Sequence, residues 1–162
     1  MIRLAADADF DEILRVYDAA KAYMRSHGNP TQWKDGYPHP ELVMSDINAG
    51  NMYVLCGDDG AVHACFGVFE GDDPTYSYIE GKWLDSAPYV AVHRVASDGT
   101  LRGVFRQAFE FVSAKYAHIR IDTHKDNITM QKAVTSCGFK YCGIIYVSDG
   151  SPRMAYEWTL EK

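Results

Sequence analysis

The stretch 92–108 constrains this chain most, because it places three local signals in a fixed order. An apolar run ending at Ala96 predicts a strand, residues 97–99 predict a turn, and apolar positions spaced by three and four from Leu101 predict a helix. A helix that begins directly after a strand leaves backbone N–H groups unpaired in its first turn. These donors and the helix dipole favour an anion, and Gly103 allows close approach to the backbone. We interpret this turn as a site for a phosphate-bearing cofactor.

The other predicted elements alternate helices with short strands. Strands are predicted at residues 2–5, 51–56, 61–70, 89–96, 119–123, 139–147 and 153–160, with a partial strand pattern at 75–83, and helices at 10–27, 40–50, 101–116 and 128–137. Helices interleaved with strands predict a mixed α/β sheet that is covered on both faces. No linker or repeat divides the sequence, so we expect a single domain over residues 1–162.

Charge and hydropathy argue against two classes of partner. The net charge of −6 argues against nucleic-acid binding, which relies on Lys and Arg to neutralise phosphates. No apolar stretch approaches the roughly 18 residues that span a bilayer. The acidic residue Asp7 makes the start of the chain unlike a signal peptide. We therefore expect a cytoplasmic protein with no nucleic-acid and no membrane partner.

A search for reactive motifs gives mostly negative results. The four cysteines Cys56, Cys65, Cys137 and Cys142 form no CxxC pair, and the histidines form no HExxH or HxxxH. We therefore expect free, buried thiols and no metal site. Walker A, dinucleotide-binding and GxSxG motifs are absent as well. Taken alone, the 92–108 turn is explained by a structural role more often than by phosphate binding.

Aromatic side chains gather before the central turn. The loop 31–40 holds Trp33 and Tyr37 among two prolines and a glycine, and Tyr78 and Trp83 follow further along. Exposed aromatic side chains usually pack on a partner or cover a site. We predict that these four wall a substrate pocket, where aromatic rings and carboxylates suit a cationic amine. Packing in the core or at a homodimer interface explains the same residues, and the loop is either a substrate lid or a segment pinned by its rings.

Three segments taken together resemble the Gcn5-related N-acetyltransferase (GNAT) family, including bacterial members. They are His93-Arg94-Val95-Ala96 with Arg102-Gly103-Val104, then Ile119-Arg120-Ile121-Asp122-Thr123-His124-Lys125-Asp126-Asn127, then Cys137-Gly138-Phe139-Lys140-Tyr141-Cys142-Gly143. The resemblance implies a mostly antiparallel central sheet of about six to seven strands, splayed between strands four and five, with helices on both faces. It also implies an N-acetyltransferase that uses acetyl-CoA.

The resemblance further implies where acetyl-CoA binds. Backbone groups of Val95, Ala96 and Ser97 on the fourth strand would hold the pantetheine arm, and Asn127 would contact the cofactor. The pyrophosphate would lie on the loop formed by Leu101, Arg102, Gly103, Val104, Phe105, Arg106 and Gln107. This loop departs from the family pattern [QR]-x-x-G-x-[GA], because Phe105 stands at the second glycine. The Phe105 ring either crowds the pyrophosphate or turns into the core, as its place on the apolar helix face favours.

The expected reaction is direct attack on the thioester by a primary amine of a small-molecule or amino-acid-like acceptor. The amine must be neutral, so a general base is needed near pH 7. Glu80 and His93 are the candidate bases, although a solvated carboxylate and a hydrogen-bonded sheet histidine explain the same residues. Backbone N–H groups of the fourth strand would stabilise the oxyanion.

A second departure from the family concerns the acid. The position where many members carry a tyrosine that protonates the leaving thiolate is Val134 here. A different acid or a water must therefore serve, and Tyr146 and Tyr141 are weak candidates for this role. A non-catalytic acyl-CoA-binding or regulatory module is therefore the alternative function.

Overall fold

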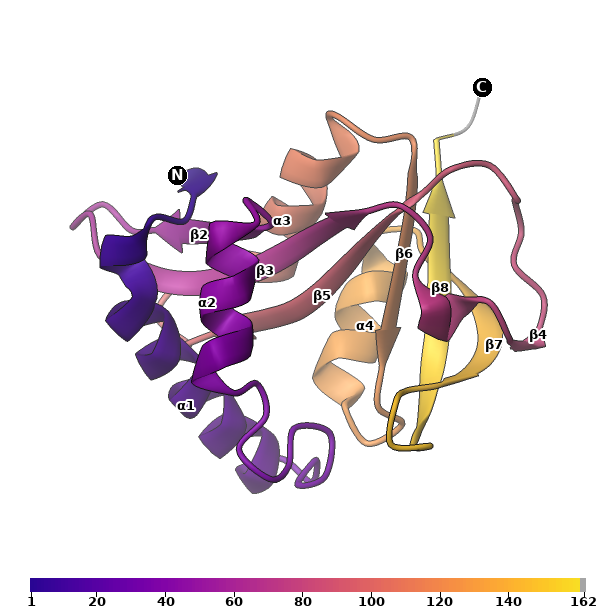
Figure 1. The fold of residues 1–162 in the computed structure, drawn as a ribbon, viewed down its shortest axis with the longest axis horizontal. Coiled ribbons are helices and arrows are strands. Elements are labelled where there is room, and N and C mark those ends of the chain that lie inside the picture. The colour runs from indigo at the N-terminus through magenta and orange to yellow at the C-terminus, as the bar shows by residue number, and fades with distance from the viewer. Residues whose placement is uncertain (161–162) are drawn as a thin grey trace.

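The computed structural model describes residues 1–160 and contains one mixed sheet with four α-helices (Figure 1). The strands are β1 (Ile2–Leu4), β2 (Met52–Cys56), β3 (Val62–Glu70), β4 (Glu80–Gly81), β5 (Val90–Ser97), β6 (His118–Thr123), β7 (Lys140–Tyr146) and β8 (Pro152–Thr159). The helices are α1 (Phe10–Ser26), α2 (Pro40–Asn48), α3 (Val104–Ser113) and α4 (Ile128–Ser136). The strand order is β1-β2-β3-β5-β6-β8-β7-β4. Neighbouring strands are antiparallel except β5 and β6, which confirms the expected mixed, mostly antiparallel sheet.

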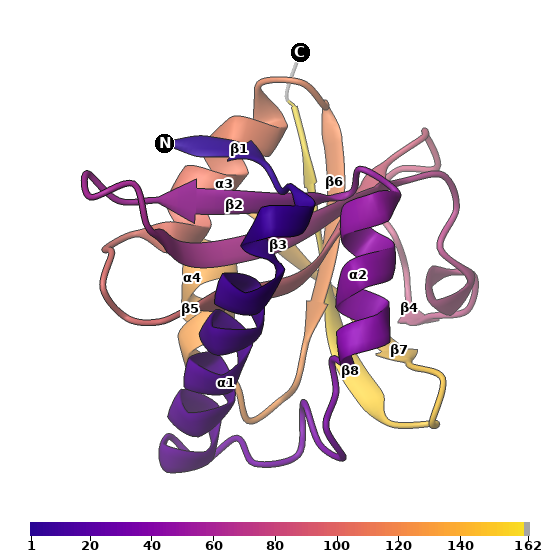
Figure 2. The same cartoon turned by 60° about the vertical axis from the view of Figure 1, so that its left-hand side comes forward.

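Helices cover both faces of the sheet, as the sequence predicts. α1 and α2 lie on one face, and α3 and α4 lie on the other (Figures 1 and 2). The first core includes Ile13, Val16, Val43, Val54 and Cys65. The second core includes Phe66, Val92, Ala108, Ile121 and Val134. Apolar residues spaced by three and four along each helix explain these two buried faces.

The segment between β3 and β5 differs from its expected strand. A 3₁₀ turn at Pro74–Tyr76 replaces the start of the 75–83 pattern, and only Glu80–Gly81 forms a strand, β4, which pairs with β7. The sheet therefore has eight strands rather than six to seven. The physical reason is local: Asp73 accepts a hydrogen bond from the backbone N–H of Thr75, at 3.0 Å, and caps a turn that starts at Pro74.

β5 and β6 separate after a short parallel contact. Residues 90–91 of β5 pair with residues 119–120 of β6. Beyond them, residues 94–95 of β5 stand opposite one residue of β3, Phe66, which makes a β-bulge. Arg94 in this bulge has φ 55°, a left-handed conformation that is uncommon for a residue with a long side chain. The splay expected between the fourth and fifth strands is thus confirmed, and it lies between β5 and β6.

Two smaller expectations concern hydropathy and thiols. Within residues 1–160, no helix is long and apolar enough to cross a membrane. The four cysteines are buried and free, as expected.

Candidate active site

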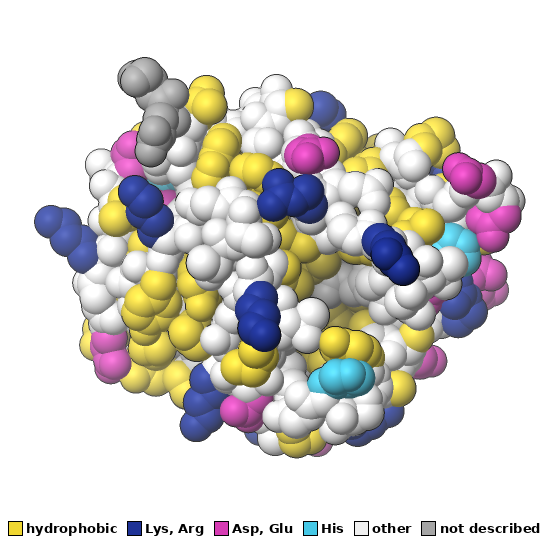
Figure 3. All heavy atoms as spheres, turned by 180° about the vertical axis from the view of Figure 1, so that it is seen from behind, with side chains coloured by type: hydrophobic (Ala, Val, Ile, Leu, Met, Phe, Trp, Pro, Cys, Tyr) yellow, Lys and Arg dark blue, Asp and Glu magenta, His cyan; other side chains and the backbone are white. Residues whose placement is uncertain are grey.

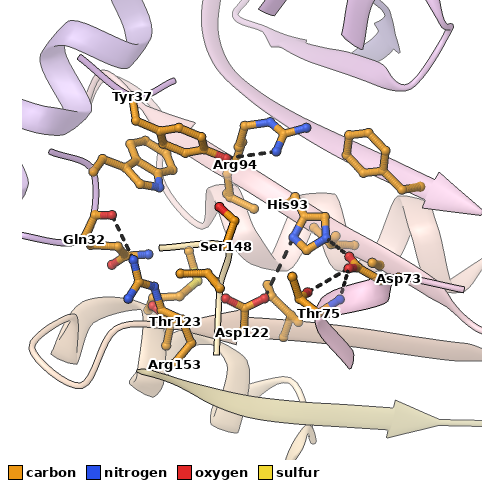
Figure 4. Close-up of a pocket in the computed structure, with 18 of the residues that line it drawn as sticks. Gln32, Tyr37, Asp73, Thr75, His93, Arg94, Asp122, Thr123, Ser148 and Arg153 are labelled. Carbon is orange, nitrogen blue, oxygen red and sulfur yellow. Dashed lines mark hydrogen bonds and ion pairs between the residues drawn. The ribbon is translucent and has the colours of Figure 1, made fainter. Parts of the chain in front are cut away.

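A cleft of about 590 Å³ opens where β5 and β6 separate. Its sides are residues 92–95 of β5 and 121–123 of β6. The loop between α1 and α2, the segment after β3, the start of α4 and the loop between β7 and β8 form other parts of its walls (Figure 4). Side chains from distant parts of the chain therefore meet at the splay.

His93 and Asp73 form a hydrogen-bonded pair in this cleft (Figure 4). His93 Nε2 lies 2.7 Å from Asp73 Oδ2, and Thr75 donates to Asp73 Oδ1 through its hydroxyl at 2.7 Å. Burial acts to raise the pKa of Asp73, but the hydrogen bonds from His93 and Thr75 outweigh it and lower the pKa to about 2. Because an ionised Asp73 accepts the Nε2–H, it leaves Nδ1 of a neutral His93 as the basic nitrogen.

Asp122 lies on the other side of the His93 ring. Asp122 Oδ2 is 3.9 Å from His93 Nδ1 and accepts a hydrogen bond of 2.7 Å from the Tyr76 hydroxyl. Burial, followed by the charge of Asp122, raises the pKa of Tyr76 well above its usual range, so this phenol remains a donor. His93 Nδ1 and Asp122 are close enough to contact one small polar group together.

The bulge in β5 is held by contacts from α1, α2, β3 and the loop between α1 and α2. The Arg94 guanidinium bonds to both carboxylate oxygens of Asp46, at 2.8 and 2.9 Å, and to the hydroxyl of Tyr37 at 3.1 Å. It also lies 5.0 Å from the centroid of the Phe69 ring. The hydroxyl of Tyr17 donates to the Arg94 carbonyl at 3.0 Å. These contacts fix the backbone of residues 94–95 beside the cleft and offset the cost of its left-handed conformation.

The loop between α1 and α2 is pinned across the site. The side-chain amides of Asn29 and Asn127 both donate to Gln32 Oε1 at 2.9 Å. Arg153 donates to the Gln32 carbonyl at 3.1 Å, and Trp33 packs against the first core while also lining the cleft. Of the two sequence interpretations, the structure shows a loop anchored by its side chains, and this loop forms one wall of the cleft.

The turn after β5 leads to an open helix N-terminus. α3 begins at Val104, and Gly103 before it has φ 62°. A Cβ built on Gly103 would meet no atom of the described residues within 4 Å, so the space beside this backbone is free. Because the first N–H groups of a helix lack intrahelical partners, this end can bind an anion.

Comparison with solved structures decides the family. A GNAT-family acetyltransferase from Streptococcus agalactiae matches with a TM-score of 0.88 and 34% identity, over 100% of this chain and 96% of that one. This chain belongs to the GNAT family of acetyltransferases. A GNAT-family acetyltransferase from Listeria monocytogenes (TM-score 0.72, 19% identity, 99% and 94% covered) and a Staphylococcus aureus structure (0.72, 23%, 99% and 99%) share the fold. Neither a family model nor a curated protein matches the sequence.

The residues expected to bind acetyl-CoA in this GNAT protein lie in two places. Val95 and Asn127 line the cleft, whereas Ala96 and Ser97 continue β5 beyond it. The residues from 101 to 107 surround the start of α3, where Arg106 bonds to the carbonyl of Ser136 at 3.1 Å. The role of these residues toward the cofactor stays a prediction.

Phe105 turns into the core of this GNAT protein. It is 8% exposed and meets the Phe139 ring edge-on, with centroids 5.9 Å apart. The core placement that the helix pattern favours is confirmed, so the ring leaves the backbone at Gly103 open.

Replacing Phe105 by leucine therefore distinguishes a ring that packs in the core from a ring that crowds the bound cofactor. The F105L variant is expected to lower the free energy of unfolding by about 1 kcal/mol, because one large apolar side chain replaces another at some loss of fit. The affinity for acetyl-CoA is expected to stay unchanged. Urea unfolding and titration calorimetry measure the two quantities. Markedly tighter acetyl-CoA binding without a loss of stability would show instead that the ring obstructs the loop.

A histidine outside the cleft holds the turn that precedes α3. His63 Nδ1 lies 2.8 Å from Asp98 Oδ2, and the backbone N–H of Thr100 donates to Asp98 Oδ1 at 2.9 Å. The hydrogen bond to Asp98, with a smaller contribution from Asp59, raises the pKa of His63 above its ordinary value of 6.5. The stabilisation from this pair is complete below the unfolded pKa and is lost as pH rises through the folded pKa.

The H63Q variant is therefore expected to lose more stability in mildly acidic than in alkaline buffer. Unfolding free energies of the two proteins, measured from about pH 6 to about pH 9, should converge as pH rises. A difference that stays constant or widens with pH would contradict the assigned pair.

Four of the residues predicted to act in catalysis or to wall the substrate pocket lie outside the cleft. The hydroxyl of Tyr146 donates to Glu80 at 2.8 Å on the exposed edge formed by β4 and β7, and Tyr78 lies beside Tyr146. Trp83 instead covers the guanidinium of Arg120, which lies 4.0 Å from its ring centroid. The reason is topological, because β8 and β7 separate β4 from β6 and carry this segment away from the splay. These four residues are therefore not part of the site proposed below, which keeps His93, Trp33 and Tyr37.

Three polar residues of the cleft were missed by sequence reasoning. Asp73 carries a local signal, because Asp-Pro-Thr is typical of a capped turn. Asp122 belongs to the segment 119–127 that resembles the family, but no role follows for it from the sequence. Arg153 carries no local signal, because its position depends on how distant strands pair.

Proposed function

We propose that this GNAT protein transfers the acetyl group of acetyl-CoA to a primary amine of a small, amino-acid-like acceptor by direct attack. The observation that carries the proposal is the His93–Asp73 pair at the splay of β5 and β6. A hydrogen-bonded histidine facing a cleft beside a fixed, bulged strand has the parts that amine acylation requires. These parts are a base, a place for the acceptor and backbone groups for the developing oxyanion.

The described residues fit acetyl-CoA at two points. The open backbone at Gly103 and the first turn of α3 suit a pyrophosphate. Lys and Arg side chains surround a hollow near the centre of the molecular face opposite to that of Figure 1, which suits a polyanionic ligand (Figure 3). When bound, acetyl-CoA supplies the activated acyl group as a thioester.

His93 is proposed to remove a proton from the attacking amine, directly or through a water. The bond to Asp73 orients the ring and stabilises the imidazolium that forms, as a buried carboxylate does for other catalytic histidines. Asp122 and Asp73 attract an ammonium group to this end of the cleft before it loses its proton. The backbone N–H groups at the Arg94–Val95 bulge are the proposed oxyanion donors.

The leaving group needs little help from an acid. Val134, at the position of the family tyrosine, is fully buried and offers no proton. Tyr141 and Tyr146 are exposed on β7, outside the cleft. A thiol has an ordinary pKa of about 8.5, so a thiolate leaves near neutral pH without a dedicated donor. The imidazolium of His93 or a water is then sufficient to return the proton.

The proposal is tested by thiol release. The protein is incubated with acetyl-CoA and a panel of free amino acids and other primary amines, and free thiol and acetylated product are measured together. We expect thiol release that depends on the amine and equals the N-acetylated product in amount. Tight acetyl-CoA binding by calorimetry, without turnover on any amine, would favour the non-catalytic acyl-CoA-binding module instead. A homodimer remains a prediction, which sedimentation of the free protein tests.

A further inference from the structure

Arg153 shares a sheet face and a cleft with the proposed catalytic residues (Figure 4). It lies on β8 two residues before Ala155, which pairs with Asp122 of β6. Since side chains alternate along a strand, Arg153 and Asp122 point to the same side of the sheet. His93 and the guanidinium of Arg153 therefore lie on opposite sides of Asp122 and face the same cleft.

The bonding of Arg153 differs from that of the other largely buried arginines. Arg94 is paired with Asp46, and Arg120 with Glu157. Arg153 is only 8% exposed, yet its hydrogen bonds go to two neutral carbonyls, those of Pro152 at 2.9 Å and Gln32 at 3.1 Å. Among residues 1–160, no carboxylate oxygen lies within 4.0 Å of its guanidinium.

A nearby acid does not serve as its partner. Asp149 lines the same cleft, but its Oδ1 accepts the backbone N–H of Ser151 at 2.8 Å and the residue is exposed. A guanidinium carries five N–H donors, and its planar fork matches a carboxylate in a two-bond pair. A buried cation that bonds only to carbonyl dipoles at the wall of a cleft is therefore suited to an anionic ligand group.

We propose that Arg153 binds the carboxylate of the acceptor, so that the acceptor is a free amino acid whose amine faces His93. This inference rests on the proposed function and narrows its substrate class. The cleft complements a zwitterion, because Asp73 lies beside His93 at the end that receives the amine and Arg153 lies at the other end, with Asp122 between them (Figure 4). Arg153 is a binding residue and takes no part in proton transfer.

Ligand binding without acetyl-CoA tests the inference independently of catalysis. Thermal shift and calorimetry are performed with the common L-amino acids, β-alanine and γ-aminobutyrate, each compared with its carboxamide. At least one free acid is expected to bind the wild type roughly ten- to hundred-fold more tightly than its amide, since hydrogen bonds to a charged group contribute more than neutral ones. The R153Q variant is expected to lose this preference, and R153K to keep part of it. R25Q, which removes an exposed arginine at the end of α1, is the matched control and should keep the preference in full.

Several results would overturn the inference. They are amides that bind as well as acids, an R153Q protein that still prefers acids, or no binding by any free acid. A purely structural role for Arg153 predicts that R153Q and R153K lower stability without changing the ratio of acid to amide affinity. If acids bind with the expected preference while no amine releases thiol, the carboxylate site stands and the transferase proposal fails.

Discussion

Replacing His93 by glutamine is expected to slow acetyl transfer by roughly 10²–10⁴-fold, the usual contribution of a positioned general base. Glutamine can still donate a hydrogen bond to Asp73 but cannot take up a proton near neutral pH. The variant should therefore fold normally and bind acetyl-CoA with unchanged affinity. The measurement is the initial rate of thiol release, with calorimetry for the cofactor.

The pH profile separates a base from a structural histidine. In the wild type, kcat/KM should decrease as pH falls, because a general base must be unprotonated to act, and this dependence should be absent from the H93Q variant. D73N should also lose activity, because the neutral amide no longer stabilises the imidazolium. H39Q replaces an exposed histidine just before α2 and is the matched control, expected to keep the wild-type rate and profile. An H93Q protein that keeps the full rate would exclude His93 as the base.

Replacing Glu157 by glutamine is expected to lower the free energy of unfolding by about 3–5 kcal/mol, because it removes one partner of a buried charge network. Glu157 is fully buried and accepts hydrogen bonds from His118, from Arg120 at 3.1 Å and from the backbone N–H of Leu84 at 2.5 Å. Glutamine would leave the cation of Arg120 buried without its carboxylate. Through the contact with Leu84, the network also holds the segment before β5 against the sheet. A local rearrangement therefore does not recover the stability that E157Q loses.

Urea unfolding at neutral pH measures this effect, and E110Q on the exposed face of α3 serves as the control. The control should change stability by less than about 0.5 kcal/mol, as surface substitutions usually do. A loss in E157Q no larger than that of the control would mean that Arg120 finds another partner or that water reaches the network.

Local pattern predicted the elements well and the site only in part. Apolar spacing identified α3 and placed Phe105 in the core, because a helix face is set by residues three and four apart. The 71–89 segment has no such period, and its path depends on Asp73 bonding to His93 and on Trp83 packing against Arg120. Both contacts join residues from different strands or loops. The sequence therefore offered Glu80 as a carboxylate near the fourth strand, while the fold brings Asp73 to His93.

The order of the strands in the sheet limits how much of the site can be predicted from local sequence patterns. Arg153 enters the cleft because β8 inserts between β6 and β7, a long-range pairing that alternation along one strand does not encode. The family resemblance predicted the splay, and the bulge at Arg94 explains it, but resemblance carries no information about the acceptor. The acceptor is instead inferred from a difference among the buried arginines. Arg94 and Arg120 pair with carboxylates, whereas Arg153 bonds only to backbone carbonyls.

The proposed roles of His93 and Arg153 are tested together by a structure of the protein with a non-reactive acetyl-CoA analogue and a free amino acid. We expect the pyrophosphate at Gly103 and the start of α3, and the thioester carbonyl at the Arg94–Val95 bulge. The acceptor amine should lie within hydrogen-bond reach of His93 Nδ1, and its carboxylate should lie on Arg153. A thioester or an acceptor amine bound beyond the reach of His93 would contradict the assignment of His93 as the base.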